Sequence, residues 1–508
     1  MAEYLLAHDI GTSGNKATLY TIDGKLVASE VYPYDAYYLN NNWAEQDAED
    51  WWKAVCYSTK KLTANINVKN IAAVSFSGQM MGCLCVNRKG IPLRRAIIWA
   101  DQRADKEAES LEKGIKQKDF YKITGHRISP AYSLEKLMWI KNNEPEIYRN
   151  TYKMLNSKDY IIFKLTGEFI TDRSDASGTN LYDLINNKWS DSIIDVAGID
   201  GNMLPKVHES IYAVGGVTKE AAQQTGLAEG TLVVCGGGDG SCAAVGAGCI
   251  ENGMVSSVMG SSANVAIVTE KILDFDGMKI SNWGHIVPGK LNVTGSMQTA
   301  GLSYSWLKNE ICRSETMEAV EKGISPYKIM DEEVEKSRPG SMGVIFLPYL
   351  LGERSPYWNP KARGAFIGLT MEHKREDILR SVLEGVIYNL NISLDIFKKY
   401  YDINELVVMG GGAKGVIWQQ IMADIYNIKV RKPKFMEEAS STGAAIAAGI
   451  GAGIFKDFNV VDRFIEIDST YLQNCESRKI YDKGYNIFKH SYEALTGIYD
   501  EIANYNWM

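Results

Sequence analysis

Three glycine-rich turns, each directly after a short apolar segment, constrain the fold of this chain more than any other sequence feature. They are Asp9–Asn15, Gly260–Asn264 and Gly410–Gly415. Small residues after a strand let backbone N–H groups approach an anion closely, which is one way to bind phosphate. A single turn of this kind is also compatible with a simple chain reversal, and none has the GxxxxGK[ST] or GxGxxG spacing. Their distribution over both halves of the chain favours a nucleotide held between two similar domains over a P-loop or Rossmann fold.

Strand-like and helical segments alternate along most of the 508 residues, which indicates an α/β fold. We expect strands at 4–9, 16–21, 71–77, 231–235, 254–259, 265–269 and 405–409, and helices at 50–64, 133–160 and 376–399. The segments DIGTSGNKATLY and VMGSSANVAIV share the same strand–turn–strand pattern with few identical residues, which alone is weak evidence for an internal repeat. The predicted domains span 1–247 and 248–460, followed by a helical tail over 461–508 that packs on the second domain.

The charge balance argues against nucleic acid or a membrane as a partner. There are 55 Lys and Arg against 62 Asp and Glu, a formal net charge of −7, and no basic tract. The first residues contain a short apolar run but neither the basic region nor the length of a signal peptide, and the long uncharged stretches at 252–269 and 440–455 contain polar residues or repeated glycines. Eight Cys without a CxxC pair are typical of buried thiols in a reducing cytoplasm, so we expect a cytoplasmic protein. The charge balance makes a small molecule the expected partner.

Two aspartates occupy positions where chemistry at a phosphate would need them. Asp9 ends the first predicted strand immediately before its turn, where a carboxylate is suited to hold a hydrated Mg²⁺ ion beside phosphates. Asp239 follows three glycines and precedes a small-residue helix start. The pattern leaves two interpretations of Asp239 open, a helix N-cap and a catalytic group.

Three further motifs have residues suited to ligand contact. They are GQM at Gly78–Met80 with Met81, WADQR at Trp99–Arg103, and the loop Leu347–Phe366, which is dense in Pro, Gly, aromatic and charged residues. The first two end strand-like segments and are candidates to line a polar pocket. Ordinary core packing, or a structural clamp in the case of the loop, explains the same residues without any ligand.

With these motifs in order, the chain resembles the FGGY family of carbohydrate kinases, and within it the xylulokinase-like branch. The segments that carry the resemblance are Asp9–Ala17, Asn41–Trp52, Ser77–Gly82, Ile97–Arg103, Ala131–Asn143, Gly236–Gly248, Gly352–Leu369 and Met409–Asp424. Ala131 departs from the Gly, Ser or aromatic residue usual at its position. The resemblance implies two actin-like (RNase H-like) α/β domains around a central cleft, the first binding the sugar and part of the phosphate chain and the second binding ATP.

The resemblance also implies roles for individual residues. Asp239 is expected to be the general base toward the sugar hydroxyl, and Asp9 to organise Mg²⁺ at the phosphates of ATP. The residues expected to contact the phosphate chain are Gly11, Thr12, Ser13, Gly260, Ser261 and Ser262. Those expected at the adenosine part are Gly411, Gly412 and Ala413. Those expected near the sugar are Met80, Met81, Trp99, Asp101, Asp239 and Gly240.

Two positions differ from the pattern of D-xylulose kinases. Met81 stands where those kinases usually have His, and Gly240 where they commonly have Asn, so both positions lack a hydrogen-bonding group. We expect ATP-dependent phosphorylation of a primary hydroxyl on a small ketose, with D-xylulose as the leading candidate. The alternatives are another substrate, such as L-xylulose, gluconate, another polyol or a signalling furanone, and an actin-like ATPase or regulatory protein without a sugar substrate. Family resemblance is also compatible with a homodimer.

Overall fold

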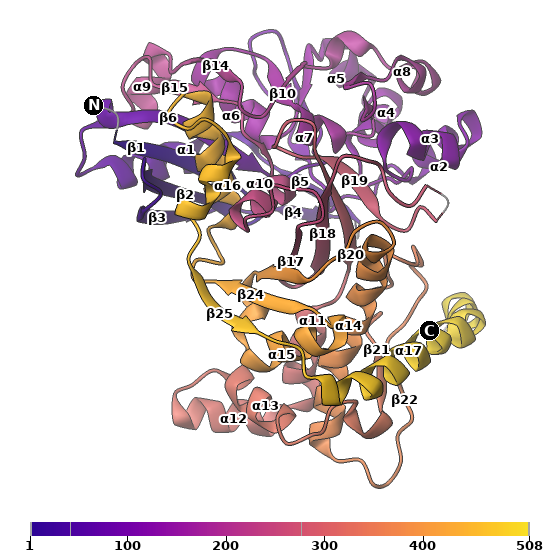
Figure 1. Ribbon diagram of the computed structural model, residues 1–508. Helices are drawn as coiled ribbons and strands as arrows, with labels where there is room; N and C mark the ends of the chain where they lie inside the picture. The colour runs from indigo at the N-terminus through magenta and orange to yellow at the C-terminus, as the bar shows by residue number, and fades with distance from the viewer. Residues whose placement is uncertain (1–2, 41, 276, 506–508) are drawn as a thin grey trace. The chain divides into compact units, whose positions relative to one another are not determined.

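The computed structural model describes residues 3–40, 42–275 and 277–505, and Figure 1 labels many of its helices and strands. The chain forms two compact units that are each assembled from separate segments. The first consists of Met1–Asn252, Val268–Val293 and Glu438–Glu466, and the second of Gly253–Ile267, Thr294–Glu437 and Ile467–Met508. Asn41, which begins one of the family-like motifs, lies outside the described residues. The division at 247/248 and 460/461 stays a prediction.

A central mixed sheet organises the first unit. In spatial order its strands are β14 (Ala213–Gly216), β15 (Leu232–Val234), β6 (Ile71–Gly78), β1 (Tyr4–Ile10), β2 (Gly14–Thr21) and β3 (Leu26–Pro33). The β1, β2 and β3 strands are antiparallel neighbours, whereas β6 runs parallel to β1 and β15 parallel to β6. Most of β1 is buried because α1 (Ala48–Thr63) packs on β2 and β3, while α16 (Ala439–Gly451) packs on β1 and β6.

The second unit repeats this topology. Its strands follow the order β20 (Leu291–Met297, this unit from Thr294 on), β18 (Ala263–Thr269, this unit up to Ile267), β17 (Val255–Met259), β23 (Glu405–Met409), β24 (Lys429–Pro433) and β25 (Ile467–Tyr471). The β17 strand is antiparallel to β18 and parallel to β23, as β1 is to β2 and β6. The weak sequence similarity between the two strand–turn–strand segments therefore corresponds to a structural repeat, and the predicted pair of α/β domains is confirmed.

Two predicted elements are wrong in part. The single helical segment expected over 133–160 is divided into α4 (Ser133–Asn143), α5 (Pro145–Asn150), β9 (Lys153–Leu155) and α6 (Ser157–Thr166). Pro145 starts α5, since a residue without an N–H is tolerated only in the first turn of a helix. The predicted helical tail begins with β25, which pairs with β24, and only then forms α17 (Cys475–Asn504).

The long α17 helix belongs to the second unit. Its N-cap is Asn474, whose side chain accepts a hydrogen bond from the N–H of Glu476 at 2.9 Å. Tyr481 anchors it to α14 (Arg375–Lys398), because the Tyr481 hydroxyl accepts from Arg380 at 2.8 Å and donates to Glu384 at 3.0 Å. None of the helices described here has the length and apolar character needed to cross a membrane.

Candidate active site

Asp9 and Asp239 lie at the same edge of the first unit's sheet. The parallel strands β1 and β6 pair Asp9 with Ser77, and the Ser77 hydroxyl donates to the Asp9 carboxylate at 2.7 Å. The short strand β16 (Gly237–Gly238) pairs with the end of β6 opposite Ser77 and Gly78 and leads directly into Asp239. Both carboxylates are half-buried.

Glycines before Asp239 let this segment lie close to β6. Gly236 has a φ of +70°, and a Cβ atom on it would lie 1.9 Å from the carbonyl oxygen of Phe76. Asp239 is the first residue of α10 (Asp239–Gly246), and its carboxylate accepts the N–H of Gly240 at 2.7 Å. Gly238 occupies the N-cap position without a side-chain cap, so the N-cap interpretation of Asp239 is wrong.

The environment makes Asp239 a weaker acid than an ordinary aspartate. Burial and the negative charge of Asp9 raise the pKa of Asp239 from 3.8 to about 7. Burial also raises the pKa of Asp9, although the Ser77 hydrogen bond and the charge of Lys16 act in the opposite direction. A carboxylate with a pKa near neutral pH is suited to accept a proton during catalysis.

The first glycine-rich turn is tied to two motifs expected at the sugar. The N–H of Gly11 donates to the carbonyl of Gly14 at 3.0 Å and closes the turn. The Gln79 amide donates to the Gly11 carbonyl at 3.3 Å, and the Trp99 indole donates to the Thr12 hydroxyl at 2.8 Å. The structure thus brings the predicted phosphate residues Gly11 and Thr12, with the exposed Ser13 beside them, together with Gln79 and Trp99.

Met80 lies against the segment that carries Asp239. A Cβ atom on Gly238 would lie 2.4 Å from the Met80 sulfur, and one on Gly178 would lie 3.0 Å from the Met80 methyl group. The same point above Gly178 is 3.3 Å from the ring of Trp283. Met80 and Trp283 therefore form an apolar wall close to Asp239.

Met81 has an unusual backbone conformation, with a φ of +63°. Its carbonyl accepts a hydrogen bond from the ammonium group of Lys136 at 2.8 Å, and the same ammonium donates to the carbonyl of Ala131. Lys136 is fully buried, and burial lowers its pKa to about 7 despite the nearby charge of Asp101.

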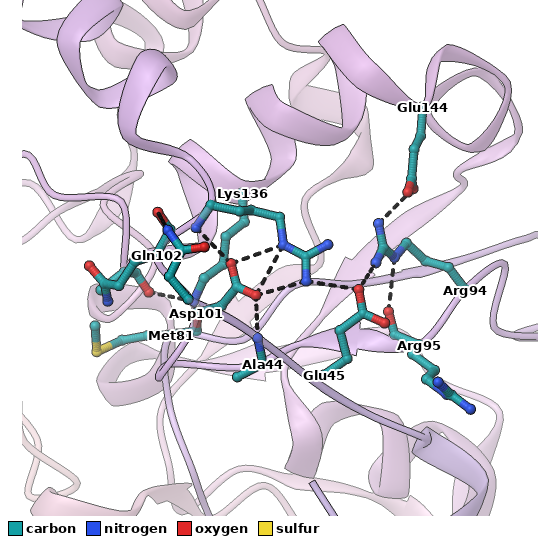
Figure 2. Close-up of polar contacts among 12 residues, drawn as sticks. Ala44, Glu45, Met81, Arg94, Arg95, Asp101, Gln102, Lys136 and Glu144 are labelled. Carbon is teal, nitrogen blue, oxygen red and sulfur yellow. Dashed lines mark hydrogen bonds and ion pairs between the residues drawn. The ribbon is translucent and has the colours of Figure 1, made fainter. Parts of the chain in front are cut away.

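Asp101 belongs to a buried ionic network (Figure 2). Its carboxylate accepts the N–H of Ala44 at 2.6 Å and pairs with Arg103 at 2.7 Å. Arg103 also contacts Glu45 at 2.8 Å, and Arg94 joins Glu45 to Glu144. Asp101 is fully buried, and both its oxygens bond to protein groups. These contacts orient the WADQR segment, while the expected contact of Asp101 with the sugar stays a prediction.

The other two glycine-rich turns lie side by side in the second unit. The Gly260–Ser262 turn is joined to the start of α11 (Gly301–Trp306), because the N–H of Gly301 donates to the carbonyl of Gly260 at 3.0 Å. Gly410 has a φ of +89°, and a Cβ on it would lie 2.6 Å from the carbonyl oxygen of Met259, which precedes that turn. Gly411 and Gly412 follow in the 3₁₀ turn η5 (Gly411–Lys414); Ala413 lies in the same turn, and its side chain is outside the described part.

A cavity of about 820 Å³ opens beside these turns. Its lining includes Gly260, Ser261, Gly301, Gly411 and Gly412, together with the aromatic side chains of Tyr304, Tyr327 and Trp418. The Tyr304 hydroxyl donates to Asp331 at 2.8 Å, and burial raises the pKa of Asp331 to about 6. Glycine turns next to aromatic walls suit a ligand that combines phosphates with a flat base.

Several groups around the site have no counterpart in the sequence-based predictions. Ser174 accepts the N–H of Gly238 at 2.9 Å and is itself held by Asp172, which pairs with the buried Lys158 at 2.9 Å. The density of small polar and acidic residues in TDRSDASGT (171–179) was the available signal. Tyr304, Asp331 and Trp418 come from three distant segments, and no local pattern joins them.

Both halves of the chain match models of one family. The N-terminal domain model of the FGGY family of carbohydrate kinases matches residues 4–246, and its C-terminal domain model matches residues 255–452. The chain belongs to the FGGY family of carbohydrate kinases. It is therefore an ATP-dependent sugar phosphotransferase, and the family resemblance drawn from the sequence motifs is confirmed.

A xylulose kinase and a gluconokinase have the same sequence identity to this FGGY kinase. The xylulose kinase of Staphylococcus xylosus is 32% identical over 494 residues, covering 96% of this chain and 100% of that protein. The gluconokinase of Bacillus subtilis (strain 168) is also 32% identical, over 507 residues, covering 99% of this chain and 98% of the relative. The crystal structure of ligand-bound xylulose kinase from Lactobacillus acidophilus superimposes with a TM-score of 0.91 at 26% identity, covering 98% of this chain and 99% of the other.

Proposed function

We propose that this FGGY kinase transfers the γ-phosphoryl group of ATP to a primary hydroxyl of a small ketose, with D-xylulose as the leading substrate, and that Asp239 accepts the hydroxyl proton. The observation that carries this proposal is the raised pKa of the half-buried Asp239, about 7, at the end of a glycine segment beside Asp9. A base with this pKa is largely ionised at slightly alkaline pH and still holds a proton well once the hydroxyl attacks.

The donor set around Asp9 fits a magnesium ion that is shared with the phosphates of ATP. No cluster of three or more His, Cys, Asp or Glu side chains forms a metal cage within the described ranges. Mg²⁺ commonly uses one or two carboxylates plus phosphates and water rather than such a cage, and Asp9 supplies one carboxylate. Asp9 would hold the ion, which when bound offsets phosphate charge.

The chain's own residues account for the remaining requirements of phosphoryl transfer, which depends mainly on positioning and charge stabilisation. We expect backbone N–H groups of the turn at Gly11–Ser13, and those of the turn at Gly260–Ser262, to bind phosphate oxygens, apart from the N–H groups of Gly11 and Gly260, which donate within their own turns. The aromatic cavity beside Gly411 and Gly412 suits the adenosine part. The apolar wall of Met80 and Trp283 would limit the access of water to the Asp239 carboxylate from that side.

Gluconate is the second candidate, because a gluconokinase is as similar to this chain as a xylulose kinase. A cation is a strong hydrogen-bonding partner for the carboxylate of a hexonate. The buried cations of the sugar-side network, Lys136 and Arg103, are engaged with backbone carbonyls and with Asp101 and Glu45. This engagement favours a neutral ketose over an acidic sugar.

The deciding experiment measures ADP release with Mg-ATP alone and with D-xylulose, L-xylulose, D-gluconate and polyols. We expect D-xylulose to give the highest kcat/KM, with transfer to its primary hydroxyl confirmed by NMR of the product. Asp239→Asn is the control for enzyme-dependent turnover. Higher kcat/KM for gluconate would replace the ketose proposal, and ADP release that no sugar stimulates would contradict both.

A further inference from the structure

Asn292 is a buried polar side chain whose amide nitrogen borders Gly240, the residue after Asp239. It lies on β20, in the part of that strand that belongs to the first unit, and is 4% exposed. Its Oδ1 atom has no hydrogen-bond partner within the described residues. Buried amide oxygens are rarely left unpaired, so an unpaired one next to a candidate catalytic group requires an explanation.

The Asn292 amide borders the space above Gly240. A Cβ atom built on Gly240 would lie 3.7 Å from the Nδ2 atom of Asn292, which is its one non-hydrogen neighbour within 4 Å among the described residues outside its chain neighbours and the backbone of its own helix. Gly240 itself is exposed, and the adjacent Asp239 is half-buried. A side chain at position 240 would therefore enter open space beside the general base and meet the amide of Asn292.

We propose that Asn292 hydrogen-bonds a substrate hydroxyl next to the reacting one, and that it replaces the amide which the D-xylulose kinase pattern places at position 240. This inference rests on the proposed function, because it assigns a contact within the same sugar site. An amide offers a donor and an acceptor, so it can pair with a hydroxyl in either direction. The ligand class is a neutral polyhydroxylated chain that presents a hydroxyl beside the phosphorylated carbon.

The geometry explains how an amide can still reach the space above residue 240, although this chain has Gly240 where D-xylulose kinases commonly have Asn. The amide approaches from β20 instead of from the start of α10, so the two positions serve the same space from different elements. The Nδ2 atom, which borders the space above Gly240, would donate a hydrogen bond to a bound hydroxyl. Substrates lacking that hydroxyl would leave the buried amide unpaired and bind less well.

The test is an exchange of the amide between the two positions. Asn292→Leu has a similar volume without polar atoms, and we expect kcat/KM for the sugar to fall about five- to tenfold, as for the loss of one hydrogen bond, with KM for ATP unchanged. Adding Gly240→Asn to Asn292→Leu should recover at least part of that loss, because an amide again reaches the same space. In calorimetric titration, D-xylulose should bind the wild-type protein more tightly than Asn292→Leu, and the variant with both substitutions more tightly than Asn292→Leu.

Asn391→Leu is the matched control. Asn391 lies in α14 of the second unit, is 5% exposed, and also has an Oδ1 atom without a hydrogen-bond partner, so its replacement reports the general cost of losing a buried amide. If Asn292→Leu does not fold, Asn292→Ala takes its place in both the single variant and the exchange.

The outcomes separate this inference from the proposed function. Sugar kcat/KM within twofold of wild type in Asn292→Leu, an equal loss in Asn391→Leu, or no recovery on adding Gly240→Asn would each overturn the role of Asn292. If the wild-type protein phosphorylates a sugar other than D-xylulose, the exchange is measured with that sugar. If no sugar stimulates ADP release by the wild-type protein, the proposed function itself fails.

Discussion

The ammonium nitrogen of Lys136 lies 2.8 Å from the carbonyl oxygen of Met81 and holds that residue in the left-handed region of backbone conformation, with φ at +63°. A non-glycine residue pays roughly 1–2 kcal/mol to adopt this conformation, so surrounding contacts must maintain it. Lys136 provides such a contact from within the protein interior and also binds the carbonyl of Ala131. The backbone at Met81, which is expected near the sugar, is therefore joined to the backbone at Ala131 by one side chain.

Lys136→Met should disturb the sugar site more than the nucleotide site. Without the ammonium group the Met81 and Ala131 carbonyls lose a shared donor, and Met81 is free to relax toward a common conformation. We expect KM for the sugar to rise about tenfold and KM for ATP to change less than twofold, alongside a loss of stability of about 1–3 kcal/mol. Lys141→Met is the control, since Lys141 is on the same helix and bonds the distant Gly198 carbonyl. A variant with an unchanged sugar KM would show that the Met81 conformation does not affect substrate binding.

The activity should depend on pH through Asp239. Its carboxyl has a pKa of about 7, so it is protonated below that pH and cannot accept a proton. We expect kcat/KM for the sugar to rise with pH, to reach half its maximum near pH 7 and to level off at higher pH. Asp9→Asn removes the negative charge that raises this pKa and should move the midpoint to lower pH in the residual activity, whereas Asp23→Asn, in an exposed turn, should not. A midpoint near 4 in the wild-type protein would contradict this account.

Asp239→Asn should separate catalysis from stability. We expect kcat to fall by roughly two to four orders of magnitude, because the amide cannot take up the proton. The folded-state pKa of Asp239 is raised above the unfolded value, so ionising the carboxyl in the fold costs stability above pH 7 and nothing well below pH 4. The Asn variant should therefore unfold at the same or a higher temperature than wild type at pH 8, and the difference should shrink as the pH approaches 4. Near-normal kcat in this variant would show that Asp239 is not the base.

The parts of the site that follow strands could be predicted from the sequence. Apolar segments followed by Asp9 or by the glycines before Asp239 mark the ends of strands, and the paired β1 and β6 bring those ends together. The break at Pro145 was also open to prediction, because proline favours the first position of a helix. In these cases local chain chemistry and the final fold agree.

Other parts depend on contacts between distant segments. Lys136 lies in a helical segment where a lysine normally faces solvent, yet tertiary packing buries it against Met81 and Ala131. Asp101 has a sequence context that suits ligand contact, but its carboxylate forms an ion pair with Arg103 and accepts a hydrogen bond from the N–H of Ala44. Asn292 approaches Gly240 from a strand more than fifty positions later in the chain. No periodicity within a segment encodes such pairings.

The predicted adenosine contact at Gly411 can be tested without disturbing the fold. A Cβ atom on Gly411 meets nothing within 4 Å, so Gly411→Ala should leave the thermal unfolding temperature unchanged. If the nucleotide lies against this residue, KM for ATP should rise about threefold to tenfold through steric contact. Gly410→Ala is the comparison, because its φ of +89° and the Met259 oxygen at 2.6 Å predict a lower unfolding temperature. An unchanged KM for ATP in Gly411→Ala would remove Gly411 from the proposed nucleotide site.

Met81 is the position that most directly tests which sugar is used. Methionine fills the space of an imidazole but cannot donate a hydrogen bond, and Met81 stands where D-xylulose kinases usually have histidine. If D-xylulose is the substrate, Met81→His should be tolerated and raise kcat/KM for D-xylulose by about fivefold to tenfold, which corresponds to one net hydrogen bond of about 1 kcal/mol.

If the true substrate places an apolar group at this point, Met81→His should instead lower kcat/KM for that substrate, because the imidazole is left unpaired, and D-xylulose activity should stay low. Met81→Leu is the matched control for a change of shape without a new polar group. Measuring kcat/KM for D-xylulose and D-gluconate in all three proteins distinguishes these cases. If neither substitution alters kcat/KM for either substrate, residue 81 does not contact the sugar. The hydrogen bond from Lys136 to the Met81 carbonyl would then affect only the stability of the fold.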